Sequence, residues 1–477
     1  MRYLILMTFG LLSLLLYAQG SFYTQYSGSE YDMGHGVVQL PDSSYVLTGR
    51  SGSWGDNAEA YLLKISKTGA YQWSQHYGGY EFDEGRRVMS HAVNGLYVAG
   101  SSMLNQATAY DLYLFNTDPN GTLSWEKRVD LGGWEFTNDA ILTFDDGVVM
   151  VGSSQDPNSS NSRGFIVKTN AAGDTLWSRF IGGTETNAIH TVLELQDSIY
   201  VVAGTYYNID STLNKGFLAA YQENGTSLWF TSIGVQGAFG ITDMTINLNR
   251  FNLTGWKYDP MLNEHDNYTG RYEFNGSLFY ESVYVNPGDV ILDEVTLNGS
   301  QTKLYVGYRN ENLSNPNFGM DITLGRFNTN FDWDNGPIYI NHGGDEKVEQ
   351  FIPTLDGGAL AVGSITYPMN GGSSVFAMKI GPNDEFQTVI GSEPMLPLVA
   401  TEPIDGVGVS LFPNPMQDLL SITLAQGNGL VSFHDVNGLE FLKQEIEAGK
   451  TLINVSELAA GVYFIRYAGT TWKFIKL

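Results

Sequence analysis

The sequence contains no cysteine. Disulfide bonds, thiolate zinc sites and cysteine nucleophiles are therefore excluded, and the fold must be stabilised by its packed core. The chain also has no GxSxG nucleophile elbow, no HExxH helix and no EF-hand loop, and its seven histidines show no metal-ligand spacing. No particular reaction is indicated, although a carboxylate pair could be assembled from many of the 51 acidic residues.

Basic residues are scarce. Lysine and arginine number 25 against 51 aspartates and glutamates, which gives a net charge of −26. An acidic surface repels phosphate backbones, so nucleic acid is not expected as a partner. Cations, basic proteins and neutral polymers remain open.

Long hydrophobic runs are lacking except at the N-terminus. There, Arg2 precedes an apolar run from Leu4 to Leu16, and Ala18-Gln19-Gly20 fits a small-x-small cleavage site. We predict that residues 1–20 are a secretory signal peptide, cut after Ala18 or Gly20. The alternative is a membrane anchor, but the run is shorter than the ~20 residues that a span requires. No later stretch could span a bilayer, so no transmembrane segment is expected after signal removal.

Glycine and aromatic residues are abundant, which favours strands and tight turns. A tryptophan strand recurs at intervals of 52 residues, at Trp73, Trp125, Trp177 and Trp229, and the series continues with Tyr280, Trp333 and Phe386. A glycine that ends an apolar strand recurs independently, at Gly49, Gly100, Gly152, Gly204, Gly255, Gly307 and Gly363. Repeats of this length are typical of propellers and solenoids.

One repeat contains four strand-length segments, VVQL, YVLTG, YLLKI and YQWSQHY, with turn signals between them. This pattern predicts a four-stranded antiparallel meander, which is the shape of a propeller blade. Residues 21–391 are therefore predicted to form an all-β, seven-bladed β-propeller, with eight blades as the alternative. The tryptophans are expected to fill the wedge-shaped gaps between blades. The segment Ser21–Gly28 resembles a final strand and is predicted to pair beside the last blade and close the ring.

The repeats resemble those of secreted bacterial propellers, with the pattern YGG, DGGYVVAGS, a lysine-bearing strand and NGxxxW. The matches include Asp145-Asp146-Gly147-Val148-Val149 and Asp356-Gly357-Gly358-Ala359-Leu360. Proteins with such repeats have many roles, so the resemblance implies a fold and no particular activity.

After Gly391 the repeat stops. Residues 392–406 are proline-rich and predict a linker, and residues 407–477 contain short alternating strands with a hairpin signal at Asn437-Gly438. This segment is predicted to be a small immunoglobulin-like β-sandwich.

The order of motifs in this segment resembles the type A C-terminal sorting domain of the type IX secretion system of Bacteroidetes. The residues that carry the resemblance are Pro413, Asn414, Pro415, Gly461, Tyr463 and Lys473. It implies passage through the periplasm, export by the type IX machinery, and either release or attachment to the outer-membrane surface. An ordinary accessory domain is the alternative.

Propellers bind ligands where loops gather around the central channel. The loops that follow the tryptophan strands carry Glu30, Glu81, Glu135 and Glu185, each two residues after a glycine. These acids could form a ring that holds Ca²⁺. The alternative, favoured by their repetition, is that each acid accepts backbone hydrogen bonds within its own blade.

The loops between the second and third strands carry aromatic residues that do not repeat. These are Trp54, Tyr206, Tyr207, Trp256, Tyr258, Tyr308 and Tyr367. Flat rings among amide and hydroxyl groups suit a sugar, although the rings could simply pack the loops.

The sequence thus predicts a secreted or surface-attached propeller that binds a glycan or a protein, without a catalytic assignment. The alternatives are a polysaccharide-active enzyme, either a glycosidase or a lyase, that uses acids on the same face, and a structural surface protein.

Overall fold

The computed structural model describes residues 20–476 except for short segments. The segments outside it are 29, 54–56, 80, 105–108, 159–160, 183–185, 208–213, 235–236, 285–289, 312–319, 341–344, 367–371, 387–395, 398–408, 413–418, 436–438, 457, 460 and 468–469. The predicted signal peptide lies almost wholly outside the described residues, as do both predicted linker boundaries.

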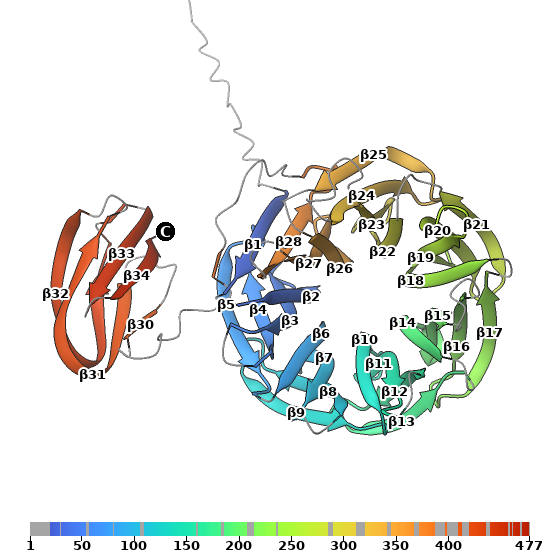
Figure 1. Cartoon of the computed structure of the whole chain (residues 1–477), viewed down its shortest axis with the longest axis horizontal. Helices are drawn as coiled ribbons and strands as arrows, with labels where there is room; N and C mark the ends of the chain where they lie inside the picture. The colour runs from blue at the N-terminus through green and yellow to red at the C-terminus, as the bar shows by residue number, and fades with distance from the viewer. Residues whose placement is uncertain are drawn as a thin grey trace, which may run out of the picture.

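Six four-stranded antiparallel sheets and one five-stranded sheet form a ring (Figure 1). The innermost strands are β2 (Asp32–Gln39), β6 (Phe82–His91), β10 (Trp134–Leu142), β14 (Thr186–Leu195), β18 (Ala238–Asn247), β22 (Val290–Leu297) and β26 (Asp345–Pro353). We number the blades 1 to 7 in the order of these inner strands. The β-propeller fold predicted from the repeats is confirmed.

The remaining strands of each blade follow outward in chain order. The second strands are β3 (Tyr45–Ser51), β7 (Gly95–Met103), β11 (Val148–Gln155), β15 (Ile199–Tyr207), β19 (Arg250–Asp259), β23 (Lys303–Glu311) and β27 (Ala359–Thr366). The third strands are β4 (Glu59–Ile65), β8 (Tyr110–Thr117), β12 (Ser162–Thr169), β16 (Lys215–Tyr221), β20 (Glu264–Glu273), β24 (Met320–Asn328) and β28 (Ser373–Ile380). The outer strands are β5 (Tyr71–Tyr77), β9 (Leu123–Val129), β13 (Thr175–Phe180), β17 (Ser227–Ile233), β21 (Leu278–Tyr284), β25 (Trp333–Ile340) and, in blade 7, β1 (Phe22–Ser27).

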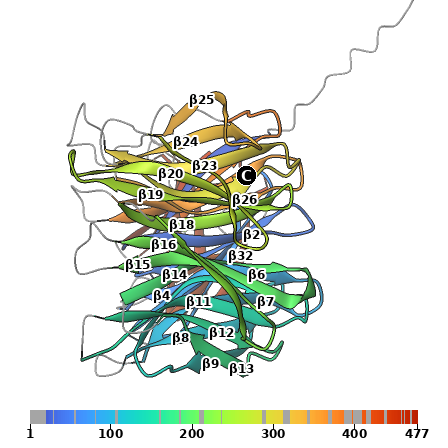
Figure 2. The same cartoon turned by 90° about the vertical axis from the view of Figure 1, so that its right-hand side faces the viewer.

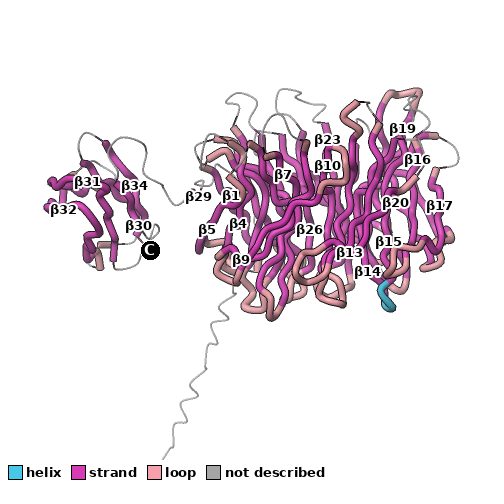
Figure 3. The backbone as a smooth tube through the Cα atoms, turned by 90° about the horizontal axis from the view of Figure 1, so that it is seen from below, coloured by secondary structure: helices cyan, strands magenta, loops and turns pink. Residues whose placement is uncertain are grey.

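Strands run across the ring from one face to the other, and loops gather at both faces (Figures 2 and 3). A single 3₁₀ turn, η1 (Gln196–Ser198), is the only helical element among the described residues. The middle strands are covered on both sides by neighbouring blades, and all eight residues of β28 are buried. The sequences of such strands are therefore mostly apolar along their whole length. The core lies between the blades, as in the cluster that joins Leu62 of blade 1 to Val98 of blade 2.

The N-terminal strand closes the ring, as predicted. Strand β1 pairs antiparallel with β28, with Phe22 opposite Lys379, and the short strand β29 (Leu396–Pro397) pairs with the other edge of β1. Tyr26 is buried, and its hydroxyl donates to the carbonyl oxygen of Gly69 in blade 1 at 2.5 Å. The hydroxyl of Tyr77 donates in the same way to the carbonyl of Gly121 in blade 2, at 2.6 Å.

The repeated tryptophans lie between blades, but the expectation that they fill buried gaps requires correction. Trp73 lies on an outer strand and is half-buried, and its ring packs against the turn of the next blade. A Cβ at Gly121 would meet the Trp73 ring at 3.0 Å, so the glycine makes room for the ring. Trp125, Trp177 and Trp229 are placed equivalently, whereas Tyr280 is exposed. The outer strand has no further strand beyond it, so one side of each ring stays in solvent.

The seventh member of the series is Phe22, and the sequence-based choice of Phe386 was wrong. Phe22 lies opposite Lys379 just as Trp73 lies opposite Lys64, and it packs against Gly69. Phe386 follows the last described strand of blade 7 and packs against the cluster between blades 6 and 7. Phe386 was chosen because it continues the spacing of the aromatic series, but the outer strand of blade 7 is β1, from the other end of the propeller sequence.

The C-terminal segment forms its own sheet. Its strands are β30 (Val409–Phe412), β31 (Leu419–His434), β32 (Glu440–Asn454), β33 (Gly461–Tyr467) and β34 (Thr470–Lys476). Strand β31 pairs with β32 along most of its length, with β30 near its beginning and with β33 at its end. Leu420, Phe433, Ile446 and Ile465 belong to the apolar core of this unit.

Candidate functional site

Every inner strand of the propeller contains a β-bulge at the same position. The bulged residues are His35, Arg86, Asn138, His190, Thr242, Asp293 and Glu349. A bulge adds one residue to a strand and re-aims the neighbouring side chains. Because the inner strands surround the axis of the ring (Figure 1), the seven bulges lie around the central channel.

A cavity of about 260 Å³ lies at these bulges. Five bulged residues line it, namely Arg86, Asn138, His190, Thr242 and Glu349. Tyr207 and Trp256 contribute aromatic walls, and Arg87, Glu294 and Lys347 contribute charges. Tyr207 is the last residue of β15, so it lies at the face that carries the loops between the second and third strands. The connections from one blade to the next lie at the same face. The cavity therefore belongs to the face that the sequence analysis selected.

Arg87 holds the wall of the channel together. Its Nε donates to Asp139 Oδ1 at 2.8 Å, and its Nη1 donates to the carbonyl oxygens of His35 at 3.0 Å and Glu349 at 3.3 Å. Its Nη2 lies 3.6 Å from Glu294 Oε1. One buried guanidinium thus joins blade 2 to blades 1, 3, 6 and 7. Burial alone would lower the pKa of Arg87, but the nearby Asp139 and Glu294 raise it above its usual value.

The channel holds more buried carboxylates than this one cation can balance. Burial raises the pKa of Asp243 to about 6, although its carboxylate accepts a hydrogen bond from the backbone N–H of Val295 at 2.8 Å. Burial, together with the charge of Asp243, also raises the pKa of Glu294 well above its usual range. Asp139 similarly accepts from the N–H of Val192 in the next blade, at 2.9 Å. Asp139 and Asp243 therefore connect adjacent blades, and Glu294 lines the cavity.

Glu349 is the ionised acid of the cavity. Its two oxygens lie 3.0 Å from Arg86 Nη2 and 2.8 Å from Lys347 Nζ. Burial would raise its pKa, but these two cations hold that pKa well below its usual range. Burial, with Arg86 and Lys347 nearby, lowers the pKa of His190 to about 4. His190 is therefore neutral at pH 7, and its Nε2 lies 3.2 Å from the hydroxyl of Tyr207.

The predicted aromatic residues have different fates. Tyr207 and Trp256 line the cavity. Tyr206 packs against Phe217 and Phe230, and Tyr258 packs against His265. Tyr308 lies on β23, but its side chain is not among those that the structure describes. Trp54 and Tyr367 lie outside the described residues.

The four residues of the predicted acidic ring do not occupy equivalent environments in the structure. Glu30 is exposed, Glu81 is half-buried, Glu135 is fully buried and Glu185 lies outside the described residues. Glu135 instead shares its register with Asp32 and Asp83, each three residues before a bulge. All three acids accept local hydrogen bonds, such as that from Ser102 Oγ to Asp83 at 2.6 Å and that from Gly133 N to Glu135 at 2.8 Å. Of the predicted ring, Glu135 therefore has the local bonding that the sequence analysis gave as the alternative.

Sequence reasoning missed the charged channel. Its signal was present, because the bulged residues from His35 to Asp293 recur every 51 or 52 residues, in phase with the tryptophans. They are polar residues at one repeating position of the inner strands, and five of the seven line the channel cavity.

With this geometry established, comparison with known families identifies the C-terminal segment. Residues 410–476 match the family described as the secretion system C-terminal sorting domain. The protein is therefore a β-propeller that the type IX secretion system exports to the cell surface or the extracellular space, and its sorting domain implies interaction with that machinery. Gly461 begins β33, Tyr463 lies on it, and Lys473 lies on β34, whereas Pro413, Asn414 and Pro415 fall outside the described residues.

Solved structures resemble the chain in overall shape at low identity. A puromycin hydrolase matches with 11% identity and a TM-score of 0.49, over 84% of this chain and 59% of that one. PorZ of Porphyromonas gingivalis, a surface component of the type IX secretion system, matches with 13% identity and a TM-score of 0.42, over 91% of this chain and 58% of that one. The β-propeller domain of the Trilobed protease from Pyrococcus furiosus matches with 11% identity and a TM-score of 0.41, over 74% of this chain and 93% of that one. The chain thus spans less than two thirds of the length of the first two.

The search of curated proteins found no match. Among the described residues, the structure has no helix of the length and apolarity needed to cross a membrane.

Proposed function

We propose that the protein is a surface-exported recognition propeller that binds a glycan at the cavity in its central channel. The observation that carries this proposal is the pairing of Tyr207 and Trp256 with charged and amide groups around one cavity. A pyranose has an apolar face, which packs on aromatic rings, and a polar edge, which hydrogen-bonds to groups such as Asn138 and Lys347. Export to the cell surface or the extracellular space supports the proposal, because a site there is accessible to extracellular polymers.

The size of the cavity favours a small part of a glycan. Its volume of about 260 Å³ is below the ~300–1,000 Å³ of sites that enclose a drug-sized ligand. Arg87, which bonds to groups of several blades, lies in its wall. These features support recognition of a terminal sugar or a branch that enters from the open face, with the rest of the polymer outside.

The test is a glycan and polysaccharide binding screen of the full-length secreted chain, followed by Trp256→Ala. We expect this variant to lose at least tenfold in affinity, because removal of a stacked ring costs ~1.4 kcal/mol or more. Trp134→Ala is the matched control, since Trp134 is exposed and is not among the cavity residues. Equal affinity of wild type and Trp256→Ala, with both folded by circular dichroism, would contradict the proposal. A blank screen would favour a protein partner or a structural surface role.

A second function, polysaccharide cleavage, is favoured by one further observation. Glu294 and Glu349 line the same cavity, yet the pKa of Glu294 is raised and that of Glu349 is lowered. General acid–base catalysis uses two carboxyl groups whose environments separate their pKa values in this way. Any glycan found to bind should be tested for turnover, and Glu294→Gln should abolish that turnover while binding persists. Turnover that survives Glu294→Gln would remove this assignment.

A further inference from the structure

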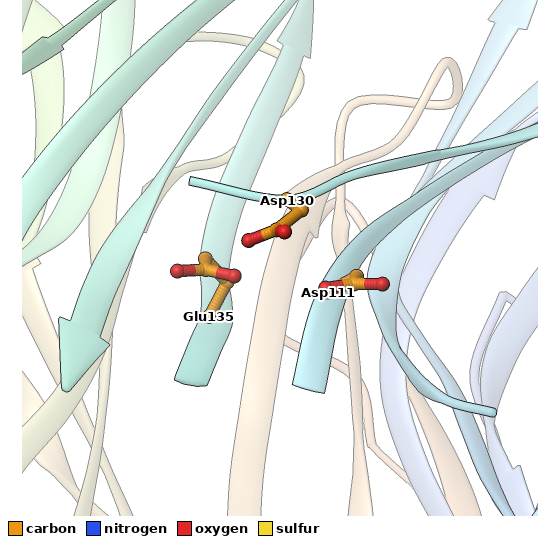
Figure 4. A group of neighbouring side chains, drawn as sticks. All are labelled: Asp111, Asp130 and Glu135. Carbon is orange, nitrogen blue, oxygen red and sulfur yellow. The ribbon is translucent and has the colours of Figure 1, made fainter. Parts of the chain in front are cut away.

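Three carboxylates meet on the rim of the propeller between blades 2 and 3. Asp111 is the second residue of the third strand of blade 2, Asp130 lies in the connection between the blades, and Glu135 lies on the inner strand of blade 3. One oxygen from each lies within 4.8 Å of the others. Figure 4 shows the carboxyl groups of Glu135 and Asp130 turned toward each other, with Asp111 beside them.

The hydrogen bonds of Glu135 leave one of its oxygens unused. The side chain is fully buried, and Oε1 accepts from Ser154 Oγ and from the backbone N–H of Gly133, both at 2.8 Å. Oε2 is also buried but has no hydrogen-bond partner. A buried carboxylate oxygen without a partner is costly, so such an oxygen indicates a ligand that the protein itself does not supply.

The equivalent acids of the two preceding blades are satisfied in other ways. Asp32 accepts hydrogen bonds from Ser51 and Ser53 and from the backbone N–H of Gly28. Asp83 accepts from Ser102 and lies 3.7 Å from Arg128 Nη2. In blade 3 the residue is a glutamate, and its longer side chain reaches toward the two aspartates.

The nearest basic side chain in sequence is Arg128, which lies close enough for its charge to act on Asp111. Its guanidinium is directed to Asp83, Glu126 and Ser102 of its own blade. Asp130 Oδ1 accepts from the N–H of Gly132 at 2.6 Å, which fixes the connection between the blades without balancing its charge. Three negative groups are therefore held together, with Arg128 as a nearby cation that also forms ion pairs with Asp83 and Glu126.

We propose that Asp111, Asp130 and Glu135 bind a Ca²⁺ ion that links blade 2 to blade 3. Ca²⁺ prefers carboxylate oxygens and binds them at ~2.3–2.6 Å, so two of its ligands can be up to ~4.8 Å apart. It also accepts irregular geometry and completes its coordination with water, which the exposed Asp130 allows. Mg²⁺ demands a tighter octahedron at ~2.1 Å, which three ligands at this spacing fit less well.

The neighbouring aromatic residues provide a direct readout. Tyr110 and Trp134 each adjoin a ligand in sequence, and their ring centroids lie 6.5 Å apart. Tb³⁺ bound in place of Ca²⁺ should be excited by these rings, and Ca²⁺ should displace it. The experiment therefore uses the chelator-treated full-length chain, with Tb³⁺ luminescence and isothermal titration with Ca²⁺.

Asp130→Asn is the variant of choice because Asp130 is exposed and its loss should leave the fold intact. We expect it to weaken Ca²⁺ binding at least tenfold. Glu30→Gln is the matched control, since it removes an exposed acid from another connection before an inner strand and should leave affinity unchanged. Absence of saturable Ca²⁺ binding by the wild type would overturn the proposal. Equal affinities of Asp130→Asn and wild type would also overturn it, whether or not any glycan binds in the channel.

Discussion

Replacing Arg87 with methionine should destabilise the propeller strongly. Methionine keeps most of the side-chain length but removes the buried charge, together with the donors to Asp139, His35 and Glu349. At the Arg87–Asp139 separation of 2.8 Å, the pair attracts by ~6 kcal/mol if the effective dielectric constant is about 20. Part of this attraction only offsets desolvation, and loss of one partner from a buried pair typically costs ~3–5 kcal/mol. We therefore expect a loss of ~3–5 kcal/mol in the free energy of unfolding.

Equilibrium unfolding in guanidinium chloride, followed by tryptophan fluorescence, measures this loss. Eight of the nine tryptophans precede residue 392, so the signal reports mainly on the propeller. Arg179→Met is the matched control, because Arg179 is exposed on an outer strand of blade 3, and it should change stability by less than ~0.5 kcal/mol. A loss below ~1 kcal/mol for Arg87→Met at pH 8 would refute the role of Arg87 as the buried cation that pairs with Asp139 and Glu294.

Three further changes test the channel, the blade contacts and the closure. Asp243 has a folded-state pKa of about 6 against an ordinary 3.8, so the folded state binds its proton more tightly, and stability should fall by ~3 kcal/mol as pH rises from about 4 to about 6. Asp243→Asn should remove this fall, which unfolding curves at several pH values would show. If stability fell with pH as steeply in the variant as in the wild type, Asp243 would not be the group responsible. Gly121→Ala should lower the free energy of unfolding by ~1–3 kcal/mol, because φ is +85° and a methyl group would meet the Trp73 ring. Gly79→Ala is the control, since Gly79 has a φ of +82° but no neighbour within 4 Å of an added Cβ. The difference between the melting curves of the two variants therefore measures the contact with the ring. Tyr26→Phe should cost ~1–3 kcal/mol by leaving the buried Gly69 carbonyl without this donor, and a change within error in the same unfolding assay would show that this bond does not help to close the ring.

The propeller was predictable because its evidence is local and repeated. A strand covered on both faces must be apolar along its length. An outer strand must carry one large aromatic side chain that packs against the next blade. Both requirements recur in each unit at nearly constant spacing. The sorting domain was recognisable for a similar reason, since its motifs follow one another within about seventy residues. Tyr207 and Trp256 could be selected from the sequence, but not separated from Tyr206 and Tyr258, which are not among the residues that line the cavity.

The sequence by itself determined the repeating unit, the pairing of the first strand with the last blade, and the route of export. The tertiary structure decided which side chains meet. Arg87 contacts Glu349 across 262 positions, and Asp111, Asp130 and Glu135 come together from two blades, because ring closure and blade packing place them there. The bulges decide which residues point into the channel, and the spacing of the repeats alone does not show which of the recurring polar residues meet there. Burial periodicity records the environment of each residue along its own strand, whereas a binding site depends on distances between strands.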